Sequence, residues 1–171
     1  MKTHWDYTQV AQDYTKRPGY CPEAIEQMLS AAHVGKDSLV CDIGAGTANL
    51  TLMLAQRGLT VVAIEPNDAM RKQGALLTAD YDKVRWVAAT GEDTGLSAHR
   101  FALVTYASSF NTTERQKSLI EAHRILAPDG WFACMWNHRD INDNLQASIG
   151  EILKRHIPDY DSDNYGKRHE D

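Results

Sequence analysis

The sequence predicts an α/β fold in which helices cover both faces of a mostly parallel sheet. Three observations predict it. Short apolar runs alternate along the chain with segments of helical periodicity. The runs are apolar at consecutive positions, which is typical of strands that are buried on both faces. The 171 residues, of which 43% are hydrophobic and 24% charged, suit one globular domain.

The first half of the chain supplies three helices and three strands. Ile25, Met28 and Leu29 recur at the spacing of one helix face. Either Asn67 or Asp68 is a suitable N-cap for the third helix. The strands are short and apolar, and the first of them ends in glycine. The expected helices are 24–32, 49–56 and 67–79, and the expected strands are 38–43, 59–64 and 84–88.

The second half continues the alternation. Two apolar runs, 101–106 and 131–136, are expected strands, and two periodic segments, 114–126 and 145–157, are expected helices. Pro128-Asp129-Gly130 predicts a turn between a helix and a strand. Pro158 ends the last helix, and the polar tail 158–171 lacks strand alternation.

Composition disfavours several classes of protein. No apolar run approaches the roughly 18 residues of a membrane span, and the N-terminus lacks the apolar core of a secretory signal. The net charge of −5 and the scattered basic residues argue against a nucleic-acid partner. Three cysteines, Cys21, Cys41 and Cys134, cannot all pair with one another, which favours a reducing cytoplasm. No ligand spacing indicates a metal site.

A glycine loop and an acidic residue mark the predicted binding site. Gly44 and Gly46 follow the first strand and allow a tight turn, and Glu65 ends the second strand. In nucleotide-binding sheets a carboxylate about 20 residues beyond the first glycine accepts hydrogen bonds from the ribose hydroxyls. Taken singly, the loop is also compatible with an ordinary strand-to-helix turn, and Glu65 with an exposed strand end. Together they favour a nucleotide, with Glu65 contributing little to folding.

Two cofactors compete for this loop. The dinucleotide fingerprint requires glycine or alanine where Asn49 stands, and Asp42 places a carboxylate just ahead of the loop. A carboxylate there repels a pyrophosphate but attracts a cation. S-adenosylmethionine, which has a ribose and a cationic amino-acid end, fits better than NAD(P), so an NAD(P)-dependent oxidoreductase is the alternative.

Five segments resemble the motifs of class I S-adenosylmethionine-dependent methyltransferases. Residues 40–48 resemble motif I, with Ala48 in place of the last glycine. Residues 124–130 are similar to the helix-to-strand turn of the family, with Asp129 in place of a glycine. The others are 62–70, 90–96 and 101–110. The resemblance covers roughly residues 5–146 and is closest to the type-11, ubiquinone-biosynthesis-like branch, which implies a Rossmann-like fold and a small-molecule methyl acceptor.

The resemblance also implies roles for single residues. Asp42 would hold the methionine ammonium, directly or through water, and Glu65 would accept from the ribose. The backbone of Gly44, Ala45 and Gly46 would lie under the methionine and ribose. The remaining predicted contacts are Pro66 and Met70 at the adenine faces, Gly91 and Glu92 at its edge, and Ala107 and Ser108 at the sulfonium.

The N-terminal segment, residues 1–22, resembles the family's cap over the cofactor. Arg17 would then reach the methionine carboxylate, and Tyr14 or Tyr20 would wall the acceptor pocket; the alternative is a surface arm whose aromatic rings pack on the core. Catalytic residues stay unassigned, with His138, Asn111 and Tyr20 as candidates. His138 is a general base or a polar loop residue, and Asn111 stands where many relatives have histidine.

The family's fold carries an antiparallel C-terminal hairpin that this sequence does not supply. We therefore expect one domain over 1–171, with a cofactor-binding core at 37–137, that corresponds to part of a methyltransferase. A fragment that binds cofactor without catalysis is the further alternative. The apolar strand 131–136 would form an exposed sheet edge, so we expect either a homodimer through this edge or coverage by the chain's own tail.

Overall fold

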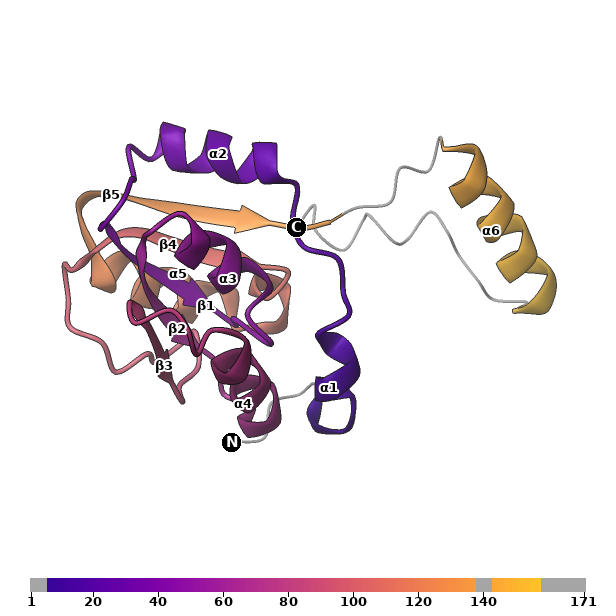
Figure 1. The fold of residues 1–171 in the computed structure, drawn as a ribbon, viewed down its shortest axis with the longest axis horizontal. Coiled ribbons are helices and arrows are strands. Elements are labelled where there is room, and N and C mark those ends of the chain that lie inside the picture. Colours follow the sequence, from indigo (N-terminus) through magenta and orange to yellow (C-terminus); the bar gives the residue numbers. More distant parts are fainter. Residues whose placement is uncertain (1–5, 138–142, 158–171) are drawn as a thin grey trace. The chain divides into compact units, whose positions relative to one another are not determined.

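The computed structural model describes residues 6–137 and 143–157. The chain forms two compact units, Met1–Trp136 and Asn137–Asp171. The first unit holds the five described strands, and the described part of the second holds one helix (Figure 1). None of the described helices combines the length and the apolar composition of a membrane span.

The sheet has five strands in the order β3-β2-β1-β4-β5, and every neighbouring pair is parallel. Their bounds are β1 Leu39–Ile43, β2 Thr60–Ile64, β3 Val84–Val87, β4 Phe101–Ala107 and β5 Leu126–Met135. The chain runs outward from β1 to β3 and then returns to the other side of β1 with β4. This reversal between β1 and β4 is the switch point where such sheets bind ligands, outside the carboxyl ends of the strands.

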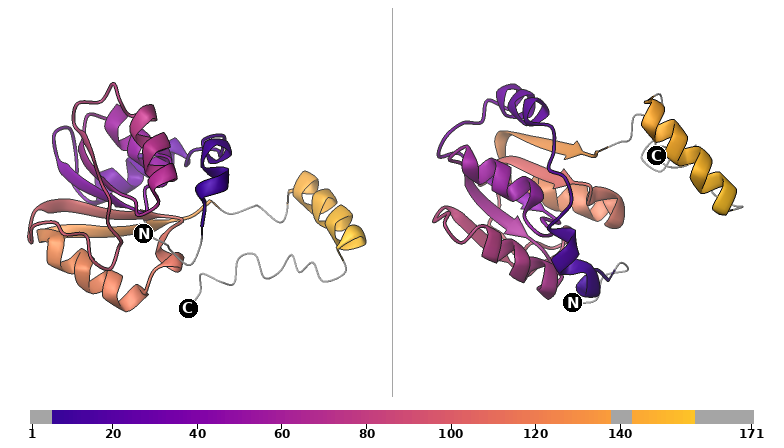
Figure 2. Two further views of the ribbon diagram at one scale, coloured as in Figure 1. Left: turned by 90° about the horizontal axis from the view of Figure 1, so that it is seen from below. Right: turned by 45° about the vertical axis from the view of Figure 1, so that its right-hand side comes forward.

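Helices cover both faces of the sheet, as the sequence predicts. Figure 2 shows α5 on one side of the sheet, with α3 and α4 on the opposite side. The bounds are α2 Pro22–Ala31, α3 Asn49–Gln56, α4 Asp68–Leu77 and α5 Arg115–Ile125. Ile25, Leu50 and Leu54 pack with one sheet face, and Ala122 and Ile125 of α5 pack with the other. Two short N-terminal helices, η1 Thr8–Val10 and α1 Ala11–Tyr14, precede α2, and η2 Phe110–Thr112 follows β4.

Strand β5 begins earlier than the sequence predicts. Leu126 already pairs with Phe101, whereas Trp131 pairs with Leu103, so the register shifts between these pairs. The expected turn at Pro128-Asp129-Gly130 lies inside the strand as this irregularity, and Asp129 has a φ of 65°. A bulge of this kind accommodates extra residues on one strand without breaking the pairing on either side.

The N-cap of α4 is Asn67 rather than Asp68. The Asn67 side-chain oxygen accepts a hydrogen bond from the Met70 backbone N–H at 3.0 Å. This bond satisfies one of the free N–H groups of the first turn.

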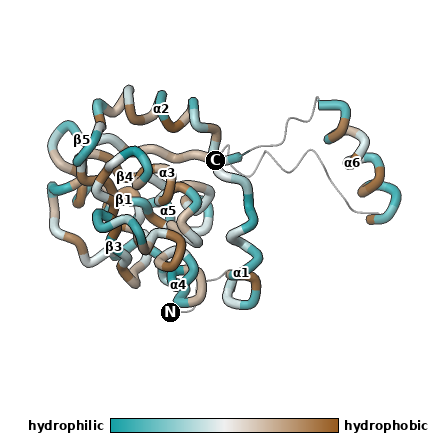
Figure 3. Tube along the Cα trace, viewed as in Figure 1, coloured by the Kyte–Doolittle hydropathy of each residue, from teal (hydrophilic) through white to brown (hydrophobic). Residues whose placement is uncertain are grey.

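The second unit contains α6, Asn144–His156, which Asp143 caps by accepting from the Gln146 N–H at 3.0 Å. Hydrophobic residues recur along this helix (Figure 3), and Leu145 and Ile152 are exposed. The predicted polar tail 158–171 and the catalytic candidate His138 lie outside the described residues.

Candidate functional site

The glycine loop after β1 folds back over the end of β2. The backbone N–H groups of Gly44 and Ala45 both donate to the Ile64 carbonyl oxygen at 2.9 Å. The next N–H, of Gly46, donates to Glu65 Oε2 at 2.9 Å. The loop and the acidic residue that the sequence pairs are therefore in direct contact.

Gly44 is required by a neighbouring loop of the protein itself. Its φ is 68°, and a Cβ at this position would lie 2.4 Å from the Cβ of Ser109, which follows β4. Ser109 Oγ donates to the Ile43 carbonyl at 2.6 Å, which holds the two loops together. The glycine thus permits close packing of the loops at the switch point, in addition to the ligand approach expected from the sequence.

Gly46 lies beneath two side chains that the sequence places at the site. Its φ is 59°, and a Cβ there would lie 3.4 Å from Met70 Cε and 3.9 Å from Tyr14 Cε1. Met70 comes from α4 and is buried, while Tyr14 comes from the N-terminal segment. These distances bring the predicted adenine-side residue Met70 against the glycine loop.

The Glu65 carboxylate is fixed by the backbone on both sides. Only 7% exposed, it accepts from Asn67 N–H through Oε1 at 2.8 Å and from Gly46 N–H through Oε2. Burial raises the pKa of Glu65, and the two backbone donors oppose that rise. Each oxygen keeps a further lone pair, so the group can still accept from two vicinal hydroxyls. The hydrogen bonds also argue against the expectation that Glu65 contributes little to folding.

Asp42 is fully buried between two threonines. Thr51 of α3 donates to Oδ2 at 2.6 Å, and Thr105 of β4 donates to Oδ1 at 3.2 Å. Burial raises the pKa of Asp42 to about 6, the threonine hydroxyls oppose this rise, and the charge of Glu65 adds to it. Asp42 has no exposed surface in this structure, so the direct contact with a ligand that the sequence predicts is not available to it, whereas its charge still lies beside the loop.

The predicted residues at the adenine edge have structural partners. Gly91 is buried, and its carbonyl accepts from the Tyr106 hydroxyl at 3.3 Å. Glu92 Oε1 accepts from the Glu114 N–H at 2.8 Å, at the start of α5. Pro66, beside Glu65, is half-buried.

The N-terminal segment reaches the end of β4. The Tyr20 hydroxyl lies 3.0 Å from Ser108 Oγ, and burial raises the pKa of Tyr20. Ser108 has a φ of 59°, a left-handed conformation that is uncommon outside glycine and clusters at functional sites. Arg17 is exposed, donates to the Tyr14 hydroxyl and lies 4.7 Å from the centre of its ring. This arrangement supports a cap over the site rather than a surface arm.

The sequence did not predict several contacts of the cap, and Asn67 was expected only as a helix N-cap. Asn67 ties the cap to α4, because its side-chain nitrogen donates to Thr8 Oγ1 at 3.0 Å. Tyr7 packs edge-on against Tyr14 at 5.4 Å between ring centres. The seven-residue spacing of these tyrosines matches two helical turns and was the available signal. Thr47 Oγ1 in the glycine loop is buried without a hydrogen-bond partner among the described residues.

The two described catalytic candidates, Asn111 and Tyr20, have different hydrogen-bond partners and do not contact each other through them. Asn111 is exposed, and its Oδ1 lies 3.5 Å from Trp136 Nε1. Tyr20 is the candidate that the structure places at the strand ends, through Ser108. Across residues 6–137 and 143–157 no cluster of three or more potential metal ligands occurs.

A family model described as a methyltransferase domain, type 11, matches residues 41–134. The chain belongs to this family of class I S-adenosylmethionine-dependent methyltransferases. Membership confirms the predicted family, the Rossmann-like fold and S-adenosylmethionine as the cofactor, and it leaves the NAD(P) alternative without support.

Similar proteins agree with this membership. The chain is 34% identical over 139 residues to uncharacterized methyltransferases of Mycobacterium tuberculosis and Mycobacterium bovis, covering 81% of its own length and 54% of theirs. It is 28% identical to the demethylmenaquinone methyltransferase of Clavibacter sepedonicus, covering 69% of the chain and 58% of that protein. The chain thus spans about half the length of these curated relatives.

Solved structures show the same fold. A putative type II methyltransferase from Anaeromyxobacter dehalogenans superposes with a TM-score of 0.69 at 21% identity, covering 81% of this methyltransferase and 57% of that chain. A methyltransferase from Aquifex aeolicus superposes with a TM-score of 0.60 at 18% identity, covering 80% of this chain and 87% of that one.

The residues at the switch point fit the family's cofactor. Two buried carboxylates, Asp42 and Glu65, flank a loop whose glycines have positive φ. Fixed negative charge at this place suits a ligand with a cationic amino-acid end and disfavours a pyrophosphate.

Proposed function

We propose that the protein transfers a methyl group from S-adenosylmethionine to a small-molecule acceptor. The observation that carries the proposal is the pair of buried carboxylates that flank the glycine loop, Asp42 in β1 and Glu65 after β2, with Glu65 oriented by two backbone N–H groups. Bound S-adenosylmethionine supplies an electrophilic methyl group on a sulfonium.

In this proposal the chain's own residues act mainly by positioning. The free lone pairs of Glu65 accept from the ribose hydroxyls, and the backbone of Gly44, Ala45 and Gly46 lies beneath the ligand. Asp42 favours the ammonium electrostatically. Met70 and Pro66 enclose the adenine, with Gly91 and Glu92 at its edge. Arg17 donates to the carboxylate of the cofactor's methionine part. Alignment of this kind can supply much of the acceleration of an in-line displacement.

The acceptor side is assigned to the end of β4. Ala107 and Ser108 lie at the sulfonium, and the Tyr20 hydroxyl, 3.0 Å from Ser108 Oγ, closes the acceptor side from the cap. Tyr20 orients the acceptor by hydrogen bonding as a neutral phenol, and burial, which raises its pKa, disfavours a role as general base. A relative named for demethylmenaquinone supports a small organic acceptor.

Binding and turnover test the proposal separately. Calorimetric titration with S-adenosylhomocysteine, the product nucleoside, is expected to show binding, and titration with NADH is not. Radiolabelled methyl transfer to a panel of phenols, hydroquinones and amines then tests activity. NADH binding without S-adenosylhomocysteine binding contradicts the proposal. Nucleoside binding without turnover favours the second candidate, a chain that binds the cofactor without catalysis.

Assembly, extent and location are part of the same proposal. We place the methyltransferase domain in the unit Met1–Trp136, and the protein in the cytoplasm, where the unpaired cysteines are stable. Strand β5 pairs only with β4 among the described strands, and Trp131 on it is 47% exposed. Such an edge supports a homodimer formed by strand pairing.

A further inference from the structure

A cavity lies at the end of the sheet opposite the glycine loop. Its volume is about 350 Å³, and the first residues of four strands, Leu39, Thr60, Val84 and Phe101, line it. The glycine loop lies at the carboxyl ends of the same strands. The cavity is therefore separate from the proposed cofactor site, and its volume falls within the range of small-molecule pockets.

The cavity exists because no helix covers this part of the sheet. The connection between β3 and β4, residues 88–100, contains no helix. Helix α5 packs on this face through Ala122 and Ile125, in a cluster with Val62 and Phe101. What remains is an apolar floor, to which Leu39, Val62 and Phe101 contribute.

The loop that forms one wall of the cavity is hydrogen-bonded to α5. Arg124 Nη2 donates to the Leu96 carbonyl at 2.8 Å, and Glu121 Oε1 accepts from the Thr94 N–H at 2.9 Å. Glu121 and Arg124 also pair with each other at 2.7 Å. These bonds fix the loop that carries Leu96 and Ser97, so the cavity is preformed.

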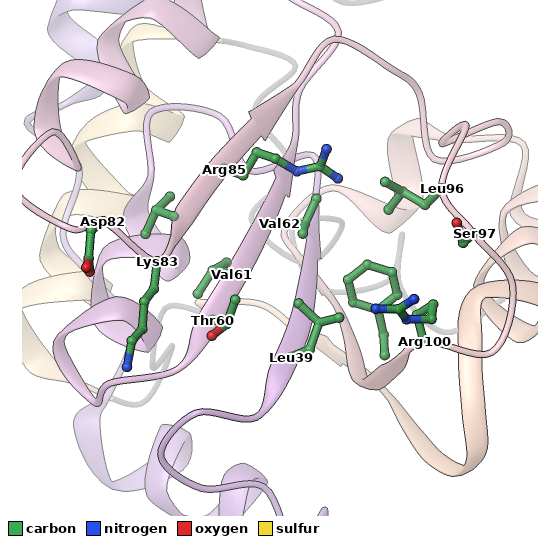
Figure 4. Close-up of a pocket in the computed structure, with 12 residues that line it drawn as sticks. Leu39, Thr60, Val61, Val62, Asp82, Lys83, Arg85, Leu96, Ser97 and Arg100 are labelled. Atoms are coloured by element: carbon green, nitrogen blue, oxygen red, sulfur yellow. The ribbon is translucent and has the colours of Figure 1, made fainter.

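Two guanidinium groups that line the cavity have no ion pair within the described part of the chain. Arg85 and Arg100 are exposed, and neither has an ion pair with a residue in the described part of the chain. Figure 4 shows the Arg85 side chain extending past Val62 toward Leu96, and Arg100 near Ser97. The third basic group, Lys83, pairs with Asp37. Asp82 also lines the cavity, so its lining carries three basic groups and one acidic group. On a protein of net charge −5, this is a local excess of positive charge beside an apolar floor.

We propose that this cavity binds a small molecule with an apolar body and a carboxylate, at a site distinct from the cofactor and acceptor sites. The apolar body lies on Leu39, Val62 and Phe101, and the carboxylate accepts from Arg85 and Arg100. Arginine is suited to this task because its planar donors match the two oxygens of a carboxylate.

The test uses octanoate as the probe and methyl NMR as the readout. Octanoate is expected to shift the methyl signals of Leu39 and Val62 in the full chain saturated with S-adenosylhomocysteine. Octanamide, which lacks the charge, and inorganic phosphate, which lacks the apolar body, are each expected to bind at least about fivefold more weakly.

Charge-removing variants give the second arm. Arg85→Gln and Arg100→Gln are each expected to weaken octanoate binding about fivefold or more, with S-adenosylhomocysteine affinity unchanged. The matched control is Arg155→Gln on α6, which removes one exposed arginine and is expected to leave both affinities unchanged.

Three results would overturn the proposal. The first is that octanoate competes with S-adenosylhomocysteine or shifts the methyl groups of Ala45 and Ala48 instead. The second is that phosphate or octanamide binds as tightly as octanoate. The third is that neither arginine variant changes octanoate affinity.

Discussion

Replacing Glu65 by glutamine separates what this carboxylate does for the ligand from what it does for the fold. Glutamine keeps one acceptor oxygen, so either the Gly46 N–H or the Asn67 N–H loses its acceptor and faces an NH₂ group. Losing a hydrogen bond of this kind in a largely buried place lowers the free energy of unfolding by about 1–3 kcal/mol. We expect that loss in urea denaturation of the ligand-free protein.

The effect on the nucleoside is larger than the loss of a neutral hydrogen bond. The hydroxyls of the ribose would donate to an ionised group, and such bonds contribute about 1.5–3 kcal/mol. Glu65→Gln is therefore expected to weaken S-adenosylhomocysteine binding roughly 10- to 150-fold by calorimetry. Glu26→Gln on α2, an exposed partner of Arg57, is the matched control and is expected to leave the affinity unchanged.

A ligand without the 2′-hydroxyl identifies the group that Glu65 contacts. The 2′-deoxy analogue of S-adenosylhomocysteine is expected to bind more weakly than the parent to the native protein, and the difference between the two ligands is expected to shrink in Glu65→Gln. The reasoning is refuted if the variant binds the parent ligand within about twofold of the native affinity. An undiminished difference between the ligands refutes the ribose contact alone.

Three other expectations follow from single features of the fold. Because burial raises the Asp42 pKa from 3.8 to about 6, the folded protein holds this proton more tightly than the unfolded chain, so Asp42 lowers stability as pH rises from about 4 to 6. Urea denaturation across that range is expected to show a fall that Asp42→Asn lessens, and equal pH profiles contradict the argument. Gly44→Ala is expected to destabilise the fold by at least about 2 kcal/mol, because Gly44 has a positive φ and an added Cβ would clash with Ser109. Gly35→Ala is expected to change stability little, because an added Cβ at Gly35 would have no atom within 4 Å. Trp131→Lys is expected to weaken self-association in sedimentation measurements, and a native protein that stays monomeric over a hundredfold concentration range excludes the β5 dimer.

Local patterns were sufficient to predict most helices and strands, because burial on both faces leaves a continuous apolar run and a covering helix leaves a 3.6-residue period. They failed at β5, where pairing with β4 already begins at Leu126, ahead of the expected Pro-Asp-Gly turn. Pairing across a bulge depends on the neighbouring strand, and the sequence of one strand does not contain it.

In the candidate site, too, local sequence predicts some contacts, and others depend on residues that are distant in sequence. The spacing of Gly44 and Glu65 predicts their proximity, since consecutive parallel strands end at one edge of the sheet. The threonine partners of Asp42 come from α3 and β4, which are distant in sequence, so its complete burial could not be predicted. Glu92 also contacts the start of α5, a contact that depends on how the loop after β3 packs.

Hydrogen bonds hold both ends of the cap, from Asn67 to Thr8 at one end and between Tyr20 and Ser108 at the other. Tyr14 lies between these ends, next to Gly46. A nucleoside held beneath the cap leaves only when these hydrogen bonds open. Its residence time would then depend on the local opening of residues 8–20 as well as on the strength of its own contacts. Dissociation rates in variants of this segment would therefore rise in step with amide hydrogen exchange in α1, even where the equilibrium affinity changes little.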